Sequence, residues 1–180
     1  MNEKNIKEIQ DLKKNKKKIV LCHGVFDFLH IGHITYFEQA KKYGDILVVS
    51  VTDDRYVNKG PLRPIFKIND RLNFLKKIKI VDYVLKSEYE TAELIIEKIK
   101  PNVYCKGPDY KNHKNDISGQ IKKEVDAIKK IGGRIVYTDD ITFSSSQLIN
   151  NHYSLQTNSK KQLIKRRWPK KKNMSGKNFD

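Results

Sequence analysis

The sequence has little of what a secreted or membrane-spanning protein would need. Its 180 residues include only two cysteines, too few for a disulfide framework. Both, Cys22 and Cys105, lie in apolar runs, which is typical of buried, reduced thiols. No apolar run approaches the ~18 residues of a membrane-spanning helix, and the first 18 residues contain no apolar signal-peptide segment. We therefore expect a soluble, cytoplasmic protein without a membrane span.

Acidic residues are also scarce. The chain has 21 Asp or Glu against 37 Lys or Arg, a net charge of +16, which is typical of nucleic-acid-binding proteins. The position of the charge weakens that interpretation, because residues 1–18 carry a net +4 and residues 151–180 a net +8, so the middle holds only +4. We expect a basic N-terminal helix over 1–17, a single domain over 18–153, and a disordered basic tail over 154–180.

What the sequence does contain is an alternation of apolar strands and amphipathic helices. Strands are predicted over 18–23, 46–51, 82–85, 103–105 and 134–138. Helices are predicted over 34–43, from Asn69 or Asp70, from Thr91 to Pro101, over 117–131 and over 144–152. This pattern predicts an α/β fold with a Rossmann-like, doubly wound, mostly parallel five-stranded sheet. Ligands of such sheets bind beyond the carboxyl ends of the strands.

The strongest motif follows the first strand and runs from His23 to His33. Gly24 lets a ligand approach the backbone, and Gly32 leaves space between His30 and His33. Two histidines three residues apart point the same way on a helical turn. A helix N-terminus at this place adds unpaired N–H groups and a positive dipole end. A His-x-x-His pair alone also occurs as a surface pair or a chance metal site, but its place after the first strand favours polyphosphate binding.

Five motifs in order resemble one family. They are residues 24–33 (GVFDFLHIGH), 58–64 (NKGPLRP), the helix led by Asp70 and Arg71, residues 106–110 (KGPDY), and residues 143–149 (FSSSQLI). Together they resemble the cytidylyltransferase-like nucleotidyltransferase superfamily. Within it, they are most similar to the adenylyltransferase domain of ADP-heptose synthases and to glycerol-3-phosphate cytidylyltransferases.

The resemblance implies an enzyme that transfers a nucleoside monophosphate from a nucleoside triphosphate to a sugar- or polyol-phosphate and releases pyrophosphate. ATP and a heptose 1-phosphate come first, CTP and glycerol 3-phosphate second. It implies that His30 and His33 contact the α- and β-phosphates, that the backbone of Val25 and Phe26 lies against the nucleotide, and that Asp27 orients this loop.

Three cations are further candidates. Lys59 is expected to be catalytic by bridging the acceptor phosphate and the α-phosphate, and Arg63 and Arg71 are expected to be phosphate clamps. The alternatives are that Lys59 is an ordinary surface lysine and that Arg71 pairs with an acidic neighbour such as Asp82.

The last two motifs supply the remaining nucleotide contacts. Ser144, Ser145 and Ser146 open a predicted helix, where hydroxyl and N–H groups suit the β- and γ-phosphates, or where a serine is simply an N-cap. Gly107 and Asp109 are expected near ribose or acceptor hydroxyls. Thr138-Asp139-Asp140 stands where glycerol-phosphate enzymes carry an arginine, which favours the heptose type.

The remaining expectations concern partners. Mg²⁺ is implied by a triphosphate substrate and is expected to bind mainly through the phosphates, with no dedicated protein ligands. The resemblance implies a homodimer and allows a separate sugar kinase in the same pathway. A class I aminoacyl-tRNA synthetase also carries a His-Ile-Gly-His string, but this chain is too short for one. A non-enzymatic RNA- or membrane-binding protein that acts through its basic ends stays open as the other alternative.

Overall fold

The structure, a computed structural model, describes residues 3–59, 63–89, 91–110 and 120–139. Its helices are α1 (Glu3–Lys14), α2 (Ile31–Lys41), α3 (Ile68–Lys76), α4 (Glu93–Ile99) and α5 (Gln120–Lys130). Its strands are β1 (Ile19–Gly24), β2 (Ile46–Thr52), β3 (Tyr83–Ser87), β4 (Val103–Lys106) and β5 (Arg134–Tyr137). The short turns Asp54–Tyr56 and Pro108–Tyr110 are 3₁₀-helical. Within these residues no helix is long and apolar enough to cross a membrane.

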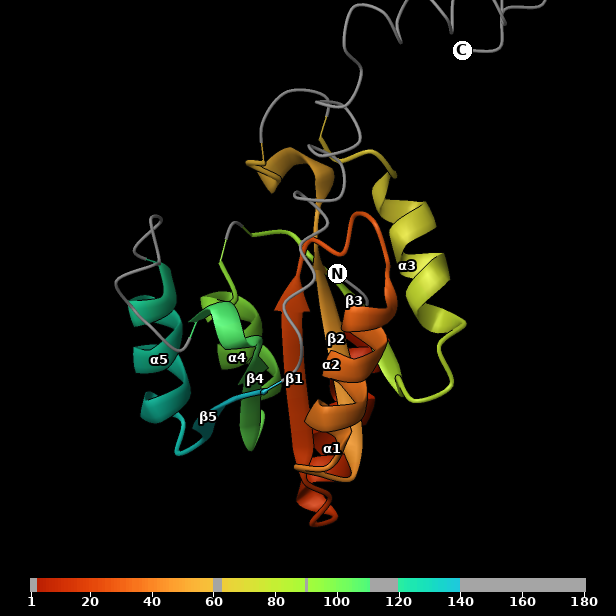
Figure 1. Cartoon of the computed structure of the whole chain (residues 1–180). Coiled ribbons are helices and arrows are strands. Elements are labelled where there is room, and N and C mark those ends of the chain that lie inside the picture. The colour runs from red at the N-terminus through yellow and green to blue at the C-terminus, as the bar shows by residue number, and fades with distance from the viewer. Residues whose placement is uncertain (1–2, 60–62, 90, 111–119, 140–180) are drawn as a thin grey trace, which may run out of the picture. The chain divides into compact units, whose positions relative to one another are not determined.

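The five strands form one sheet in the order β3-β2-β1-β4-β5. Every neighbouring pair is parallel, with Ile19 opposite Ile46 and Val103 opposite Arg134. The strands are short, apolar runs, which suits a sheet that is covered on both faces. The predicted five-stranded, doubly wound sheet is therefore confirmed, and it is parallel throughout (Figure 1).

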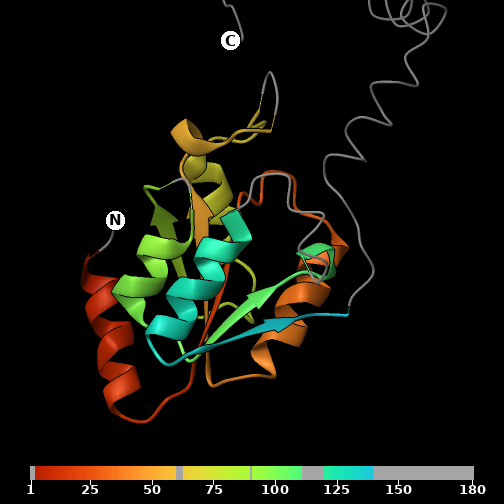
Figure 2. The same ribbon diagram turned by 90° about the vertical axis from the view of Figure 1, so that its left-hand side faces the viewer.

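Helices cover both faces of this sheet. On one face, α2 and α3 contribute Phe37, Ala40 and Leu75 to a core with alternate strand residues. On the other face, α1, α4 and α5 contribute Ile9, Ile95 and other apolar residues to a second core. Figure 2 shows α1, α4 and α5 on one side of the strands and α2 on the other. Each helix buries one apolar stripe, so the sheet is fixed from both sides.

One local expectation was wrong. The helix α3 begins at Ile68 with Lys67 as its N-cap residue, so Asn69 and Asp70 lie inside its first turn and do not cap it. In α4, Ile95, Ile96 and Ile99 are buried, whereas Leu94 is 41% exposed. The predicted helix over 144–152 lies outside the described residues.

Candidate nucleotide site

The candidate site lies where the strand order reverses. The chain passes from β1 outward through β2 to β3, and then returns to place β4 against the other side of β1. Loops that follow β1 and β4 diverge at such a point and leave a crevice beyond the carboxyl ends of the strands. The histidine motif follows β1, and the Lys106–Tyr110 motif follows β4, so the topology brings these two motifs together.

The two motif histidines form the start of α2. His30 is the N-cap residue, with extended backbone angles, and His33 is the third residue of the helix. Their rings lie 3.9 Å apart between centroids, and the backbone N–H of His30 donates to Nδ1 of His33 at 3.4 Å. With Nδ1 as the acceptor, the neutral ring of His33 carries its proton on Nε2. His33 therefore has Nε2–H left to donate to a ligand.

Burial is the main reason that His33 is neutral. Burial and the positive charges of His30 and Lys59 together lower the pKa of His33 to about 3. Burial also lowers the pKa of His30. At neutral pH the pair thus supplies hydrogen-bond donors without charge, at a helix N-terminus whose dipole favours anions. Gly32, one of the two residues between them, is buried in the first turn of α2.

Phe26 packs against other residues of the histidine motif. Its backbone has a φ of +49°, in the left-handed region, and its ring is 7% exposed. The ring packs edge-on against His33 with centroids 5.4 Å apart, and it lies so near Gly24 that a Cβ there would be 3.2 Å from it. A side chain at position 24 would therefore require the Phe26 ring to shift by a few tenths of an ångström.

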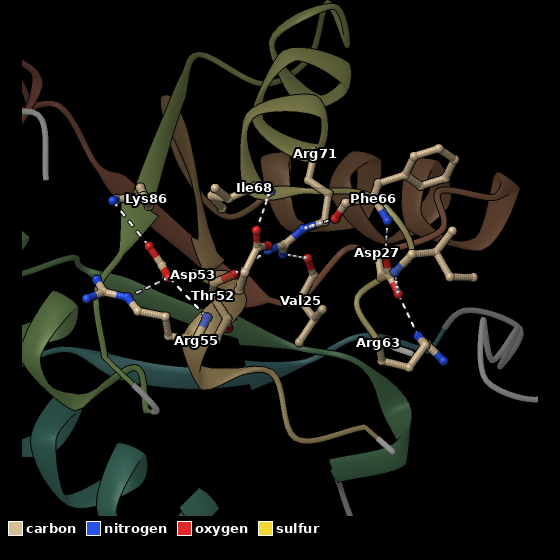
Figure 3. Close-up of polar contacts among 12 residues, drawn as sticks. Val25, Asp27, Thr52, Asp53, Arg55, Arg63, Phe66, Ile68, Arg71 and Lys86 are labelled. Atoms are coloured by element: carbon tan, nitrogen blue, oxygen red, sulfur yellow. Dashed lines mark hydrogen bonds and ion pairs between the residues drawn. The ribbon is translucent and has the colours of Figure 1, made fainter. Parts of the chain in front are cut away.

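Asp27 ties this loop to the loop after β2. Its carboxylate accepts from Nε of Arg63 at 2.6 Å and from the backbone N–H groups of Ile65 and Phe66, both at 2.9 Å (Figure 3). Burial alone would raise the pKa of Asp27, but these three donors hold it below its usual value. The Asp27 side chain is 1% exposed, and its hydrogen bonds orient residues 63–66.

Arg71 departs from the prediction that it clamps a phosphate. Its side chain is fully buried and binds four oxygens: the carbonyls of Phe66, Thr52 (2.8 Å) and Val25, and the carboxylate of Asp54 (2.6 Å). The alternative that Arg71 pairs with an acidic residue is confirmed, but the partner is Asp54 and not Asp82, which pairs with Lys41. A guanidinium enclosed in this way joins the ends of β1 and β2 to α3 and is a positioning residue (Figure 3).

Arg63 and Lys59 are the other two cations that the sequence predicts to bind phosphate. Arg63 is nearly buried beside Asp27, and its Nη2 has no hydrogen-bond partner among the described residues. Lys59 is on the surface, yet nearby protein atoms lower its pKa by desolvation, and the charge of Arg63 lowers it further. The charge of Arg63 lowers the pKa of Lys59, and the charge of Lys59 lowers the pKa of His33. The two cations and the histidine pair are therefore close enough to form one site.

A buried ion pair fixes the end of β4, where the next loop begins. Lys106 binds Glu124 of α5 at 2.8 Å, and Glu124 also accepts from the hydroxyl of Tyr104 at 3.0 Å. The ammonium of Lys106 lies 4.2 Å from the ring centroid of Tyr110. A Cβ at Gly107 would meet none of the described residues within 4 Å. The side chain of Asp109, and Ser144, Ser145 and Ser146, lie outside the described residues.

Sequence reasoning missed two acidic residues at the end of β2. Asp54 bonds both Arg71 and the backbone N–H of Ile68, the first residue of α3. Asp53 caps the turn that follows and binds Arg55 and Lys86, which lower its pKa to about 2 against the effect of burial. The sequence did contain a signal for these residues, because two carboxylates directly follow an apolar strand, where a buried charge needs a partner.

Comparison with known proteins identifies the family of this chain. The sequence model of the cytidylyltransferase-like family matches residues 21–151, which include most of β1, all of β2 to β5 and the histidine motif at the start of α2. The chain belongs to the cytidylyltransferase-like family of nucleotidyltransferases. The resemblance inferred from its motifs is thereby confirmed.

Curated relatives of this cytidylyltransferase-like chain are longer proteins. The bifunctional protein HldE of Campylobacter concisus is 41% identical over 135 residues, and that of a Nitratiruptor species is 40% identical over 137 residues. Each alignment covers 73% of this chain but only 28% and 29% of the relatives. The chain thus spans less than a third of the length of these relatives.

Two solved structures share the cytidylyltransferase-like fold described above. The lipopolysaccharide core biosynthesis protein from Thermoplasma volcanium GSS1 has a TM-score of 0.59 and 30% identity, over 70% of this chain and 99% of that one. A pantoate-beta-alanine ligase from Francisella tularensis has a TM-score of 0.54 over 81% of this chain and 70% of that one. At 16% identity, the ligase supports the fold alone.

Proposed function

We propose that this chain transfers a nucleoside monophosphate from a nucleoside triphosphate to a sugar- or polyol-phosphate. The observation that carries the proposal is the neutral pair His30 and His33 at the N-terminus of α2, beside Lys59 and at the reversal of strand order. Uncharged donors, a helix N-terminus and nearby cations suit an extended polyphosphate.

The chemistry follows from this arrangement. An oxygen of the acceptor phosphate attacks the α-phosphorus, the bond from the α-phosphorus to the bridging oxygen breaks, and pyrophosphate leaves with that oxygen. The acceptor phosphate is already ionised, so the site needs no general base. Nε2–H of His33 stabilises charge on the phosphate oxygens, while Lys59 draws the two anionic reactants together. Arg63, with its remaining donor Nη2, assists Lys59 at the acceptor phosphate.

The favoured substrates are ATP and a heptose 1-phosphate. They rest on the resemblance of the five motifs to ADP-heptose synthases and on the similarity to bifunctional HldE proteins and to a lipopolysaccharide core biosynthesis protein. The alternative pair is CTP and glycerol 3-phosphate. Asp139, in the stretch where the glycerol-phosphate enzymes carry arginine, favours the first pair.

A triphosphate brings Mg²⁺ with it. Among the described residues, no group of three or more His, Cys, Asp or Glu side chains could hold a metal ion. Asp53 and Asp54, the acidic pair at the end of β2, are already engaged by Arg55, Lys86 and Arg71. We therefore propose that Mg²⁺ binds through the phosphates and water, where it neutralises charge on the triphosphate.

The remaining parts of the proposal concern the cellular setting. They are a cytoplasmic homodimer and a separate kinase that supplies the sugar 1-phosphate. Light scattering tests the first of these, since a dimer doubles the mass of the monomer.

A screen of pyrophosphate release tests the function. ATP, CTP, GTP and UTP are each combined with sugar 1-phosphates and polyol phosphates in the presence of Mg²⁺. We expect turnover with ATP and a sugar 1-phosphate, at a rate well above that with CTP and glycerol 3-phosphate. Turnover with CTP and glycerol 3-phosphate alone would contradict the substrate choice, and no turnover with any pair would contradict the activity.

A further inference from the structure

The positive charge of this fold gathers at the end opposite the site. In a doubly wound sheet the helices run antiparallel to the strands, so all five helices end at the amino edge of the sheet, toward the bottom of Figure 1. Backbone hydrogen bonds join the connections at this edge. The N–H of Asp45 donates to the carbonyl of Lys18, that of Asn102 to the carbonyl of Ile19, and that of Arg134 to the carbonyl of Asn102. The segments at this edge, here called the amino-edge segments, are 11–18, 41–45, 76–82, 97–102 and 129–134.

The charge of these segments is strongly one-sided. They hold fifteen basic and four acidic residues, a net +11, whereas the other described residues hold eleven basic and thirteen acidic ones, a net −2. The whole positive excess of the described fold therefore lies at one edge. Most of these basic side chains are exposed; they are Lys14, Lys16, Lys17, Lys18, Lys42, Lys76, Lys77, Lys79, Lys98, Lys100, Lys129, Lys130 and Arg134.

Ordinary causes explain only part of this excess. A lysine in the last turn of a helix is favourable to the helix dipole, but that effect ends within the turn. Lys16, Lys17 and Lys79 lie beyond it, in the connections. A general richness in lysine would spread over both edges, whereas the remainder of the fold is slightly acidic.

The acidic residues at this edge also leave the excess in place. Asp11 pairs with Lys14, Asp82 with Lys41 and Glu97 with Lys130. These pairs are already counted in the net charge of the segments. Crowding of like charge is visible at Lys13, whose pKa is lowered first by burial and then by the charge of Lys100.

We propose that the amino-edge segments bind an anionic lipid surface. They contain fourteen lysines and one arginine. Nearly all of their charge is therefore on compact ammonium groups, whereas nucleic-acid recognition favours the planar, bidentate guanidinium of arginine. Among the described residues, the exposed large hydrophobic side chains all lie elsewhere, so these segments offer no aromatic platform for stacked bases. Lysines spread across a five-stranded sheet, roughly 19 Å wide, match the diffuse negative potential of an anionic bilayer.

The placement also suits an enzyme. The candidate nucleotide site lies beyond the carboxyl ends of β1 and β4, at the opposite edge of the sheet. A bilayer against the amino-edge segments leaves this site facing the solution, where soluble phosphates can enter.

Vesicle sedimentation with the full chain tests the proposal. One variant replaces four exposed lysines of the amino-edge segments, K16Q/K17Q/K77Q/K129Q. The matched control replaces four exposed lysines elsewhere, K4Q/K7Q/K122Q/K123Q, so both variants lose the same charge and keep residues 154–180 intact. The probes are vesicles of phosphatidylcholine alone and of phosphatidylcholine mixed with phosphatidylglycerol, and circular dichroism checks that each variant folds.

We expect the wild-type chain to bind only the anionic vesicles, less tightly as salt rises. The amino-edge variant should bind at least about 30-fold more weakly, since each lysine near such a surface contributes about fivefold, and the control should change less than about threefold. Equal binding by both variants would overturn the proposal. Tighter binding to random RNA than to vesicles, with the same dependence on the variants, would overturn it in favour of a nucleic acid. Neither result depends on nucleotidyl transfer.

Discussion

Replacing Arg71 by methionine removes the guanidinium that joins three segments around the site. Methionine has a similar length and no charge, so it fills the volume while leaving the oxygens of Val25, Thr52 and Phe66 without this donor. The carboxylate of Asp54 also loses its buried partner, and its remaining hydrogen-bond donor among the described residues is the N–H of Ile68.

The expected cost follows from these contacts. Removing one partner of a buried ion pair costs about 3–5 kcal/mol. Because Asp54 is 25% exposed and partly hydrated, the lower half of that range applies to the pair. The three carbonyls that lose their hydrogen-bond donor add about 1–3 kcal/mol to this loss of stability. We expect R71M to lower the free energy of unfolding by about 4–7 kcal/mol, a large share of a typical domain stability of about 5–15 kcal/mol.

Urea unfolding followed by circular dichroism measures this loss. R71K is the second variant: it keeps the charge but cannot reach four oxygens, so we expect an intermediate loss. R55M is the control, because Arg55 also pairs with a carboxylate, that of Asp53, but its side chain is 67% exposed. Its loss should stay below about 1 kcal/mol.

The opposite pattern would refute the reasoning. If Arg71 held a phosphate, as its motif first indicated, R71K and R71M would keep the wild-type stability and raise KM for the triphosphate. Unchanged urea midpoints together with a raised KM would show that Arg71 reaches the ligand.

Three further outcomes are expected. Asp27→Asn places an amide against three N–H donors, so urea unfolding should show a loss of about 1–3 kcal/mol in the free energy of unfolding. Pyrophosphate assays should show a higher KM for the acceptor. An unchanged free energy of unfolding together with an unchanged KM would contradict the orienting role of Asp27. The pKa values of about 4 for His23 and about 3 for His33 lie below their ordinary value, so the unfolded chain takes up protons first as the pH falls below 6.5. Stability should therefore drop by about 1–2 kcal/mol per histidine between pH 7.5 and 5, and a His23→Gln variant that drops as much as wild type would contradict this cause. Glu124→Gln leaves the buried Lys106 without a counter-charge and should cost about 3–5 kcal/mol, whereas thermal unfolding at the wild-type temperature would show that Lys106 finds another partner.

Apolar periodicity was sufficient to predict the fold. Runs such as 46–51 are buried on both faces, as is typical of a central strand in a parallel sheet with helices on both sides. The contact of His30 with His33 was also predictable, because residues three apart share one side of a helical turn. Both predictions depended on local order along the chain.

The role of Arg71 depended on contacts far apart in the sequence. Arg71 lies on the same stripe of α3 as Ile68 and Leu75, which pack into the core, so its burial had a local signal. Its partners did not: Val25 and Asp54 come near only when β1 and β2 lie side by side. The basic amino edge is similar, since five separate lysine-rich segments meet only through the parallel order of the strands.

The most direct test of the proposed activity is the kcat of His33→Ala for pyrophosphate release, measured at saturating triphosphate and acceptor. We predict that kcat falls by about 10²–10³-fold, as for loss of one transition-state donor, while circular dichroism shows a folded protein. A folded His33→Ala variant with a kcat near that of the wild type would contradict the claim that this histidine pair stabilises the transferring phosphate.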